Sequence, residues 1–307
     1  MDDQPDLREF SQLAAMEKVL RDRAPYLAGI VRKQFKEFGR PWLVDFNTEL
    51  QTFFKNDATA LSNAVQGYIK FVLDGMLLQK RFDKTGRYES KTYAEAASEV
   101  YQNQDYMFNL YLPGIHLSHF LWRHHYLQHI FFVERFLPLA VSHGGSLFYD
   151  VGVGTGFYSK EMLRLLLHVK GEGFDLSRFS LGYTQRMLAA FGLDDRYTCG
   201  IQDIIQEPPR KPASFIFNVE VLEHLEDPLS FLKALNRMLE PGGYGLITAA
   251  ITAPNADHIY LYNSIHEVVA QIEQAGFKVI DSREDRAYEP TKSTESVPKN
   301  AAVIVTK

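Results

Sequence analysis

The chain has 307 residues, of which 46% are hydrophobic and 23% charged, and its formal net charge is −5 when its 10 histidines are counted as neutral. This is the composition of a globular protein with a sizeable core, and such mild acidity lacks the electrostatic footprint of a general nucleic-acid binder. The one cysteine excludes an intrachain disulfide, and the lack of both a signal-peptide pattern and a run of roughly 18 apolar residues predicts a cytoplasmic protein with no membrane partner.

The first part of the chain, residues 1–143, carries helical patterns. Apolar residues recur at mostly three- and four-residue spacing over Leu7–Arg23, and the longest apolar-periodic stretches run over Asp57–Lys80 and Gly114–Ala140. No convincing strand pattern interrupts them. We therefore predict an α-helical N-terminal domain over residues 1–143, which would bind substrate, cover the site as a lid or form a homodimer.

The pattern changes after His143, in residues 144–307. Short apolar runs now alternate with amphipathic stretches of about a dozen residues, which is typical of βαβ units in an α/β fold with helices on both faces of a parallel sheet. The last two apolar runs lack a helical pattern between them, so we expect them to pair antiparallel at the sheet edge, joined by a loop over residues 286–300. The expected strands are SLFYDVG, GEGFDLS, RYTCG, ASFIFNVE, GYGLITAAI, FKVIDS and AAVIVTK, and the expected helices are Phe157–His168, Arg178–Phe191, Pro228–Leu239 and Tyr262–Ala275.

A glycine-rich turn joins the first expected strand to its helix, in the sequence Asp150-Val-Gly-Val-Gly-Thr-Gly156. Glycines at alternate positions allow a tight turn and the close approach of a ligand, and the turn delivers that ligand to free backbone N–H groups at a helix N-terminus. An ordinary tight turn is the alternative. Phe157 stands where the dinucleotide fingerprint has a small residue, which disfavours a nicotinamide cofactor.

The second expected strand ends in Asp175. In an α/β sheet of this kind, a carboxylate at that position reaches the ribose hydroxyls of a bound nucleotide. A helix N-cap ahead of Ser177-Arg178-Phe179 is the alternative role for Asp175.

Further motifs follow in order: QDI (202–204), NVEVLEHLEDP (218–228), LEPGG (239–243), TAPN (252–255) and EQAGF (273–277). Together with DVGVGTG (150–156) and Asp175, they make the segment Leu147–Phe277 resemble class I S-adenosylmethionine-dependent methyltransferases, in the small-molecule group that includes ubiquinone-biosynthesis enzymes. The resemblance covers a little over half of the chain. It implies a Rossmann-like seven-stranded sheet behind the helical N-terminal domain.

S-adenosylmethionine is the cofactor that the resemblance implies. The three glycines of the turn would line its methionine and ribose part, and Asp150 would lie near its amino end. Asp175 would bind the ribose hydroxyls, and Asp203 with the backbone of Ile204 would bind the adenine edge. The full implied set is Asp150, Gly152, Gly154, Gly156, Asp175, Asp203, Ile204 and Asn218, the last beneath the cofactor at the end of the fourth strand.

A second candidate site follows the fourth expected strand in the run Glu220-Val-Leu-Glu223-His224, and His258 follows the fifth. Ligands of open α/β sheets bind at this edge, and carboxylates with imidazoles form a ligand set for a divalent cation that would polarise a substrate hydroxyl. The run is similar to the E-x-x-E-H set associated with a divalent cation in plant small-RNA 2′-O-methyltransferases and ubiquinone-biosynthesis O-methyltransferases. Without a metal, His224 would be a catalytic base supported by Glu223 and His258, or a structural residue.

Histidines and aromatic residues crowd the segment before the first strand, LPGIHLSHFLWRHHYLQHI. In the resembling family, helices at this place often cover the cofactor and build the substrate pocket. Trp122, Arg123, His125 and Tyr126 are therefore candidate substrate-binding residues, with plain core packing as the alternative. The tyrosine-rich run 101–111 would line an apolar pocket, or form the core between domains or a dimer interface.

The sequence thus predicts a methyltransferase that acts on a small biosynthetic metabolite, at oxygen, carbon or nitrogen, with no nucleic-acid partner. A methyltransferase of RNA or protein is one alternative. The E-x-x-E-H similarity favours it, whereas the acidic net charge and the lack of a Lys/Arg-rich stripe disfavour it. A non-catalytic regulatory protein that kept the cofactor fold is the other alternative, which the intact glycine turn, Asp175 and Asp203 disfavour.

Overall fold

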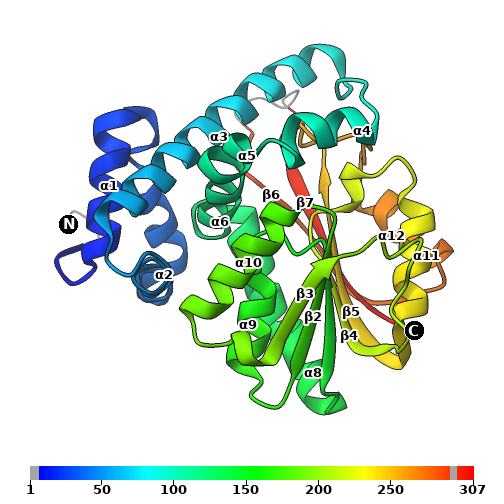
Figure 1. Cartoon of the computed structure of the whole chain (residues 1–307). Coiled ribbons are helices and arrows are strands. Elements are labelled where there is room, and N and C mark those ends of the chain that lie inside the picture. Colours follow the sequence, from blue (N-terminus) through cyan, green and yellow to red (C-terminus); the bar gives the residue numbers. More distant parts are fainter. Residues whose placement is uncertain (1–6, 291–295) are drawn as a thin grey trace.

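The structure, a computed structural model, describes residues 7–290 and 296–307 (Figure 1). The helices are α1 (Ser11–Arg23), α2 (Ile30–Phe54), α3 (Ala58–Thr85), α4 (Tyr93–Ala96), α5 (Gln104–Tyr106), α6 (Leu112–Leu121), α7 (Arg123–Phe131), α8 (Leu137–His143), α9 (Phe157–Leu165), α10 (Arg178–Ala190), α11 (Pro228–Met238) and α12 (Ile265–Gln274). The strands are β1 (Leu147–Val151), β2 (Lys170–Asp175), β3 (Tyr197–Ile201), β4 (Ala213–Asn218), β5 (Leu239–Ile251), β6 (Lys278–Arg286) and β7 (Lys299–Thr306). None of the helices in this described part is long and apolar enough to cross a membrane.

The strands form a seven-stranded sheet in the order β3-β2-β1-β4-β5-β7-β6. Strands β1 to β5 pair in parallel, whereas β7 pairs antiparallel with both β5 and β6. The parallel strands therefore all end at one edge, and β7 starts there, because Lys299 pairs with Ile251 at the end of β5. The predicted α/β class and the antiparallel closing pair are confirmed; of the predicted joining loop, residues 291–295 lie outside the described part.

Both faces of the sheet are covered by helices. Alternate residues of a strand point to opposite faces, so neighbouring residues pack against different helices. Phe148, Phe215 and Phe217 lie in one core cluster with residues of α9, α10 and the front helices. Their neighbours Tyr149 and Ile216 lie in a second cluster with residues of α11 and α12. The first cluster includes residues from both parts of the chain, so the front helices and the sheet share a core.

The apolar-periodic stretch Gly114–Ala140 does not form one continuous helix. Trp122 has extended backbone angles (φ −97°, ψ 123°), so α6 ends before it and α7 begins after it, and a π-helical turn follows over Phe132–Phe136. The apolar pattern continues across both interruptions and therefore does not reveal them. α8 ends at His143, where the sequence pattern changes, while the division into two domains there stays a prediction.

A buried ion network fixes α9, the helix after the glycine turn, against the front helices. Lys160 is 1% exposed, and its Nζ lies 2.5 Å from Glu49 Oε2 in α2 and 3.0 Å from Glu161 Oε1. His116 Nε2 lies 2.9 Å from Glu49, and His129 Nε2 lies 3.3 Å from Glu161. A buried charge that loses its partner is strongly destabilising, so these groups hold α2, α6, α7 and α9 together as a set.

We expect Lys160→Met to lower the free energy of unfolding by about 3–5 kcal/mol, because it leaves two buried carboxylates without their ammonium partner. Urea denaturation followed by circular dichroism measures the change. Lys170→Met, which replaces an exposed lysine at the start of β2, is the matched control and should change it by less than about 0.5 kcal/mol. Equal stability of the two variants would contradict the structural importance of the network.

Candidate active site

A cavity of about 1030 Å³ lies between the front helices and the carboxyl edge of the sheet. Its walls come from α2, α3, α6 and α7 on one side, and from the loops after β1 to β5 and the start of β7 on the other. Pockets for one drug-sized ligand measure roughly 300–1,000 Å³. The cavity is therefore large enough for more than one small molecule.

The glycine turn forms part of the cavity wall. Gly152, Gly154 and Gly156 have φ angles of +78°, +50° and +74°, a region that other residues rarely adopt. A Cβ at Gly152 would lie 2.4 Å from Val221, and one at Gly156 would lie 2.7 Å from Thr184. Gly152 and Gly154 line the cavity, whereas Gly156 lies outside its lining and leads directly into α9.

Two of the predicted carboxylates stand in the wall beside the turn, Asp150 buried and Asp175 half-buried. Asp150 accepts a 2.5 Å hydrogen bond from Ser159, and burial raises its pKa to about 7. Burial also raises the pKa of Asp175 to about 6. Ser177 caps α10 through its bond from the N–H of Ser180, so the alternative role of Asp175 as the helix N-cap is wrong and its carboxylate lines the cavity.

The remaining residues implied for the cofactor divide into two groups. Asp203 and Ile204 line the cavity after β3. Asn218 lies outside the lining, because its buried Nδ2 donates a 2.9 Å hydrogen bond to the carbonyl of Val151 and so ties β4 to β1. The structure therefore brings the turn, Asp150, Asp175 and the segment at Asp203 to one side of the cavity.

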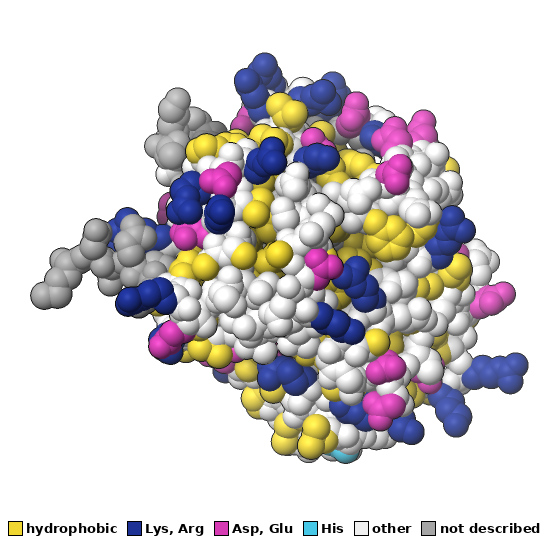
Figure 2. Space-filling model, turned by 60° about the vertical axis from the view of Figure 1, so that its left-hand side comes forward, with side chains coloured by type: hydrophobic (Ala, Val, Ile, Leu, Met, Phe, Trp, Pro, Cys, Tyr) yellow, Lys and Arg dark blue, Asp and Glu magenta, His cyan; other side chains and the backbone are white. Residues whose placement is uncertain are grey.

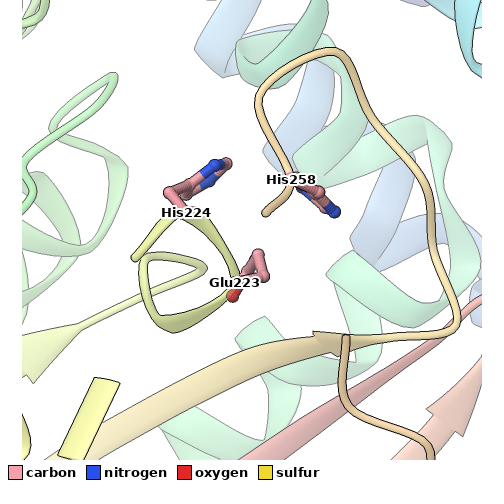
Figure 3. Close-up of side chains that lie close together, drawn as sticks. All are labelled: Glu223, His224 and His258. Carbon is pink, nitrogen blue, oxygen red and sulfur yellow. The ribbon is translucent and has the colours of Figure 1, made fainter. Parts of the chain in front are cut away.

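Glu223, His224 and His258 converge from the turn after β4 and the loop after β5 (Figure 3). One ligand atom from each lies within 4.8 Å of the others. Both carboxylate oxygens of Glu223 and Nδ1 of His258 are buried without a hydrogen-bond partner among the described residues. Burial raises the pKa of Glu223 well above its usual value and lowers that of His258 to about 3. Either a proton on Glu223 or a bound cation would relieve the cost of burying this group.

Glu220, the fourth residue predicted as a metal ligand, is not part of this cluster. Its backbone has a positive φ of +53°, and its Oε1 accepts a 2.6 Å hydrogen bond from the hydroxyl of Thr248. The N–H of Glu220 donates to the same hydroxyl oxygen at 2.9 Å. Thr248 thus holds Glu220, and three of the four predicted residues form the candidate cation site.

Asp257 positions His224, a role that sequence reasoning missed. His224 Nδ1 lies 3.1 Å from the backbone carbonyl of Asp257 and 3.4 Å from its Oδ2. The hydroxyls of Tyr101 and Tyr111 each donate a 2.7 Å hydrogen bond to the same Oδ2. Burial alone would raise the pKa of Asp257, but the neighbouring His224 and His258 together with these two hydrogen bonds lower it.

The two tyrosines end π-helical segments, Ala97–Tyr101 and Met107–Tyr111. Such segments are rare and often occur at functional sites. Here they bring the hydroxyls of Tyr101 and Tyr111 to the carboxylate of Asp257, in the loop after β5. For the tyrosine-rich run 101–111 the sequence left several roles open, a pocket lining, a core between domains or a dimer interface. Tyr101 and Tyr111 of this run line the cavity.

Three of the four predicted substrate residues line the cavity, namely Trp122, Arg123 and His125. Tyr126 does not, which corrects that prediction: it is 5% exposed and packs edge-on against Phe38 at 4.7 Å between ring centroids. Tyr126 thus takes the alternative role of core packing.

Tyr93 is another lining residue that the sequence did not identify. Burial raises its pKa, and the charges of Asp175 and Asp203 raise it further. Its backbone N–H donates to Glu226 at 2.8 Å. Helix α4 thereby lies over the end of the cavity that holds Asp175 and Asp203. No motif in the sequence predicts the contact between Tyr93 and Glu226.

The chain matches a protein family and is similar to individual curated proteins. A family model described as a methyltransferase domain matches residues 122–282. The ubiquinone biosynthesis O-methyltransferase of Maricaulis maris is 31% identical over 94 residues, 31% of this chain and 36% of that protein. The one from Ralstonia nicotianae is 34% identical over 116 residues, 36% of this chain and 44% of that protein. The chain thus spans less than half the length of these curated relatives.

Solved structures share the fold. The structure of PigF with SAH has a TM-score of 0.56 at 14% identity, covering 80% of this chain and 74% of that one. Haemonchus contortus phosphoethanolamine N-methyltransferase 2 in complex with S-adenosyl-L-methionine has a TM-score of 0.52 at 15% identity, covering 71% and 60%. At these identities the likeness concerns the fold alone, and it confirms the predicted class I sheet.

We expect Asp257→Ala to loosen the segment that carries the two tyrosines, because both hydroxyls lose their shared acceptor, whereas the backbone carbonyl that His224 contacts remains. Each unsatisfied buried donor costs about 1–3 kcal/mol, so amide hydrogen exchange in peptides over residues 93–111 should accelerate roughly tenfold or more. Asp22→Ala, at an exposed position, is the control. Unchanged exchange in the Asp257 variant would show that other contacts hold this segment.

Proposed function

This chain belongs to the methyltransferase-domain family, and on that premise we propose that it transfers the methyl group of S-adenosylmethionine to a small-molecule acceptor. The observation that carries the proposal is the arrangement of the cavity. The glycine turn, Asp150, Asp175 and Asp203 stand on one side, and Glu223, His224 and His258 stand beside them. Donor and acceptor would meet between these two groups.

The cofactor half supplies binding and orientation. Asp175, when ionised, accepts hydrogen bonds from the two ribose hydroxyls, and Asp203 with the backbone of Ile204 contacts the adenine. The glycine turn lets the methionine part lie against the backbone. Methyl transfer is a direct displacement at the sulfonium carbon, so holding the acceptor atom in line with that carbon provides much of the rate enhancement.

The cluster on the other side activates the acceptor. Asp257 engages Nδ1 of His224, which leaves Nε2 to take the proton from an acceptor hydroxyl. The residues present also fit a divalent cation, since the unpartnered oxygens of Glu223 and Nδ1 of His258 join His224 in one group. A cation held by these three residues would lower the pKa of the acceptor hydroxyl.

Burial of the cluster supports a small acceptor. Glu223, His224 and His258 are 0%, 8% and 9% exposed, so the methylated atom must enter an enclosed space. The net charge of −5 gives no attraction for a phosphate backbone. On the face that Figure 2 draws, Lys and Arg side chains are interspersed with Asp and Glu rather than gathered in one stripe.

We expect S-adenosylhomocysteine to bind the purified protein with micromolar affinity and Asp175→Ala to weaken that binding about 10- to 100-fold. Loss of hydrogen bonds to a charged group costs about 1.5–3 kcal/mol. Calorimetric titration measures both, with the exposed Asp194→Ala as control. A folded wild-type protein that binds neither this compound nor S-adenosylmethionine would contradict the proposed function.

We expect His224→Ala to reduce methyl transfer about 100-fold or more, the usual contribution of a general base. Transfer of labelled methyl from S-adenosylmethionine to a panel of phenols and hydroxylated aromatic acids measures it. His266→Ala, at an exposed position of α12, should retain full activity. Dialysis against a strong chelator then separates the two roles: retained activity assigns proton removal to His224 alone, and loss that Mn²⁺ restores assigns acceptor activation to the cation. Undiminished activity of His224→Ala would exclude it from both roles.

A further inference from the structure

The cavity extends well beyond the part that a cofactor would fill. It follows the carboxyl edge of the sheet from Asp203, after β3, to Asn300, at the start of β7. Neighbouring strands lie about 4.8 Å apart, so these five strand intervals span about 24 Å. The proposed cofactor residues occupy the β3–β1 side, and Glu223, His224 and His258 follow β4 and β5. The part over β5 and β7 lies beyond the cluster and has no assigned ligand.

This outer part, here called the far arm, is roofed by α2, α3 and α7. Gln79 of α3 donates a 3.1 Å hydrogen bond to the carbonyl of Ser296, just before β7. Gln128 of α7 accepts a 3.3 Å hydrogen bond from Asn300 of β7. Gln34 of α2 donates to the carbonyls at the end of α6, at 2.7 Å for Leu121. These bonds fix the roof helices over the start of β7 and against one another.

Apart from these amide side chains, much of the lining of the far arm is apolar. Trp122 stacks on Phe71 at 5.5 Å and on His124 at 5.6 Å between ring centroids, with interplanar angles of 19° and 16°. Burial lowers the pKa of His124 well below its usual value and that of His125 to about 3, so both rings are neutral near pH 7. The apolar lining residues are Ile30, Phe71, Val72, Met76, Leu121 and Trp122.

The far arm opens to the surface at a cationic rim. Lys33 and Lys80 line the cavity, are exposed, and have no ion-pair partner within residues 7–290 and 296–307. Arg123 pairs with Glu37 through a 2.6 Å contact. Asp83 is the acid at this rim, and Gln79 donates to it at 2.9 Å. Figure 2, which brings the side of α1 and α2 forward, shows hydrophobic side chains reaching the surface among Lys and Arg side chains.

We propose that the far arm binds the body of the methyl acceptor, and that this acceptor is an amphipathic anion: a largely apolar, aromatic or extended molecule with an acidic group at the end remote from the methylated atom. The apolar body lies along Phe71, Met76 and Trp122, and Lys33 and Lys80 face the acid. This inference rests on the proposed function for the identity of the ligand as acceptor. The binding preference itself follows from the walls and the rim alone.

Two dyes that share their ring system test the preference. 8-Anilino-1-naphthalenesulfonate carries an acidic group, and N-phenyl-1-naphthylamine lacks it. We expect one sulfonate dye to bind per chain, with a dissociation constant that saturating S-adenosylhomocysteine changes less than about twofold. Lys33→Glu with Lys80→Glu should weaken the sulfonate dye about tenfold or more and the neutral dye less than about twofold, since only the first loses charge-assisted bonds. Fluorescence titration measures all of these constants.

The matched control is Lys36→Glu with Lys84→Glu, which makes the same charge change on the same two helices at exposed positions outside the cavity lining. A second variant fills the arm: Gly75→Trp places an indole at a lining position where an added Cβ meets nothing within 4 Å, and it should abolish binding of both dyes. Gly182→Trp, at an equally open, exposed position of α10, should not.

Three results would overturn the inference: displacement of the sulfonate dye by S-adenosylhomocysteine, equal weakening of both dyes by the lysine substitutions, or unchanged dye binding in Gly75→Trp. Failure of the proposed function would give a different result. A protein that takes the dyes as expected but binds no S-adenosylhomocysteine would contradict methyl transfer and leave the far arm as a binding site for apolar anions.

Discussion

The parallel pairing of β1 to β5 is the constraint on which the rest of the site depends. Because these strands run the same way, the loops that follow them meet at one edge of the sheet. Residues as far apart in the chain as Gly152 and His258 therefore line one cavity. The antiparallel strand β7 lengthens that edge, because it begins there, and the front helices close the space above it.

Much of this arrangement is predictable from the sequence, since it depends on local patterns. The alternation of strands and helices, the glycine turn and the acid at the end of β2 each leave a signature within a few residues. The run Glu220 to His224 marks the loop after β4 in the same way. Topology then places these loops together, so the cluster of Glu223, His224 and His258 follows from strand order without knowledge of any contact.

What the sequence did not reveal depends on tertiary contacts. Asp257 joins the site because two tyrosines from distant π-helical turns donate hydrogen bonds to it. The residues near Asp257 in the chain do not predict these bonds. Tyr126 was wrongly placed in the pocket, because its packing against Phe38 of α2 is a tertiary contact that the residues around it do not predict. Glu220 left the predicted ligand set because Thr248, on the next strand, holds its carboxylate.

The buried ammonium of Lys160 limits how the two parts of this chain can be recombined. Glu161, one of its carboxylate partners, lies beside it in α9, but Glu49 comes from α2, more than a hundred residues earlier. A chimaera that joined this sheet to front helices with no acid at the position of Glu49 would therefore bury the ammonium with only one of its two carboxylate partners. A chimaera would avoid this cost only if the residue that faces Lys160 and the lysine itself were transferred together, so the front helices and the helix that follows the glycine turn form one exchangeable unit.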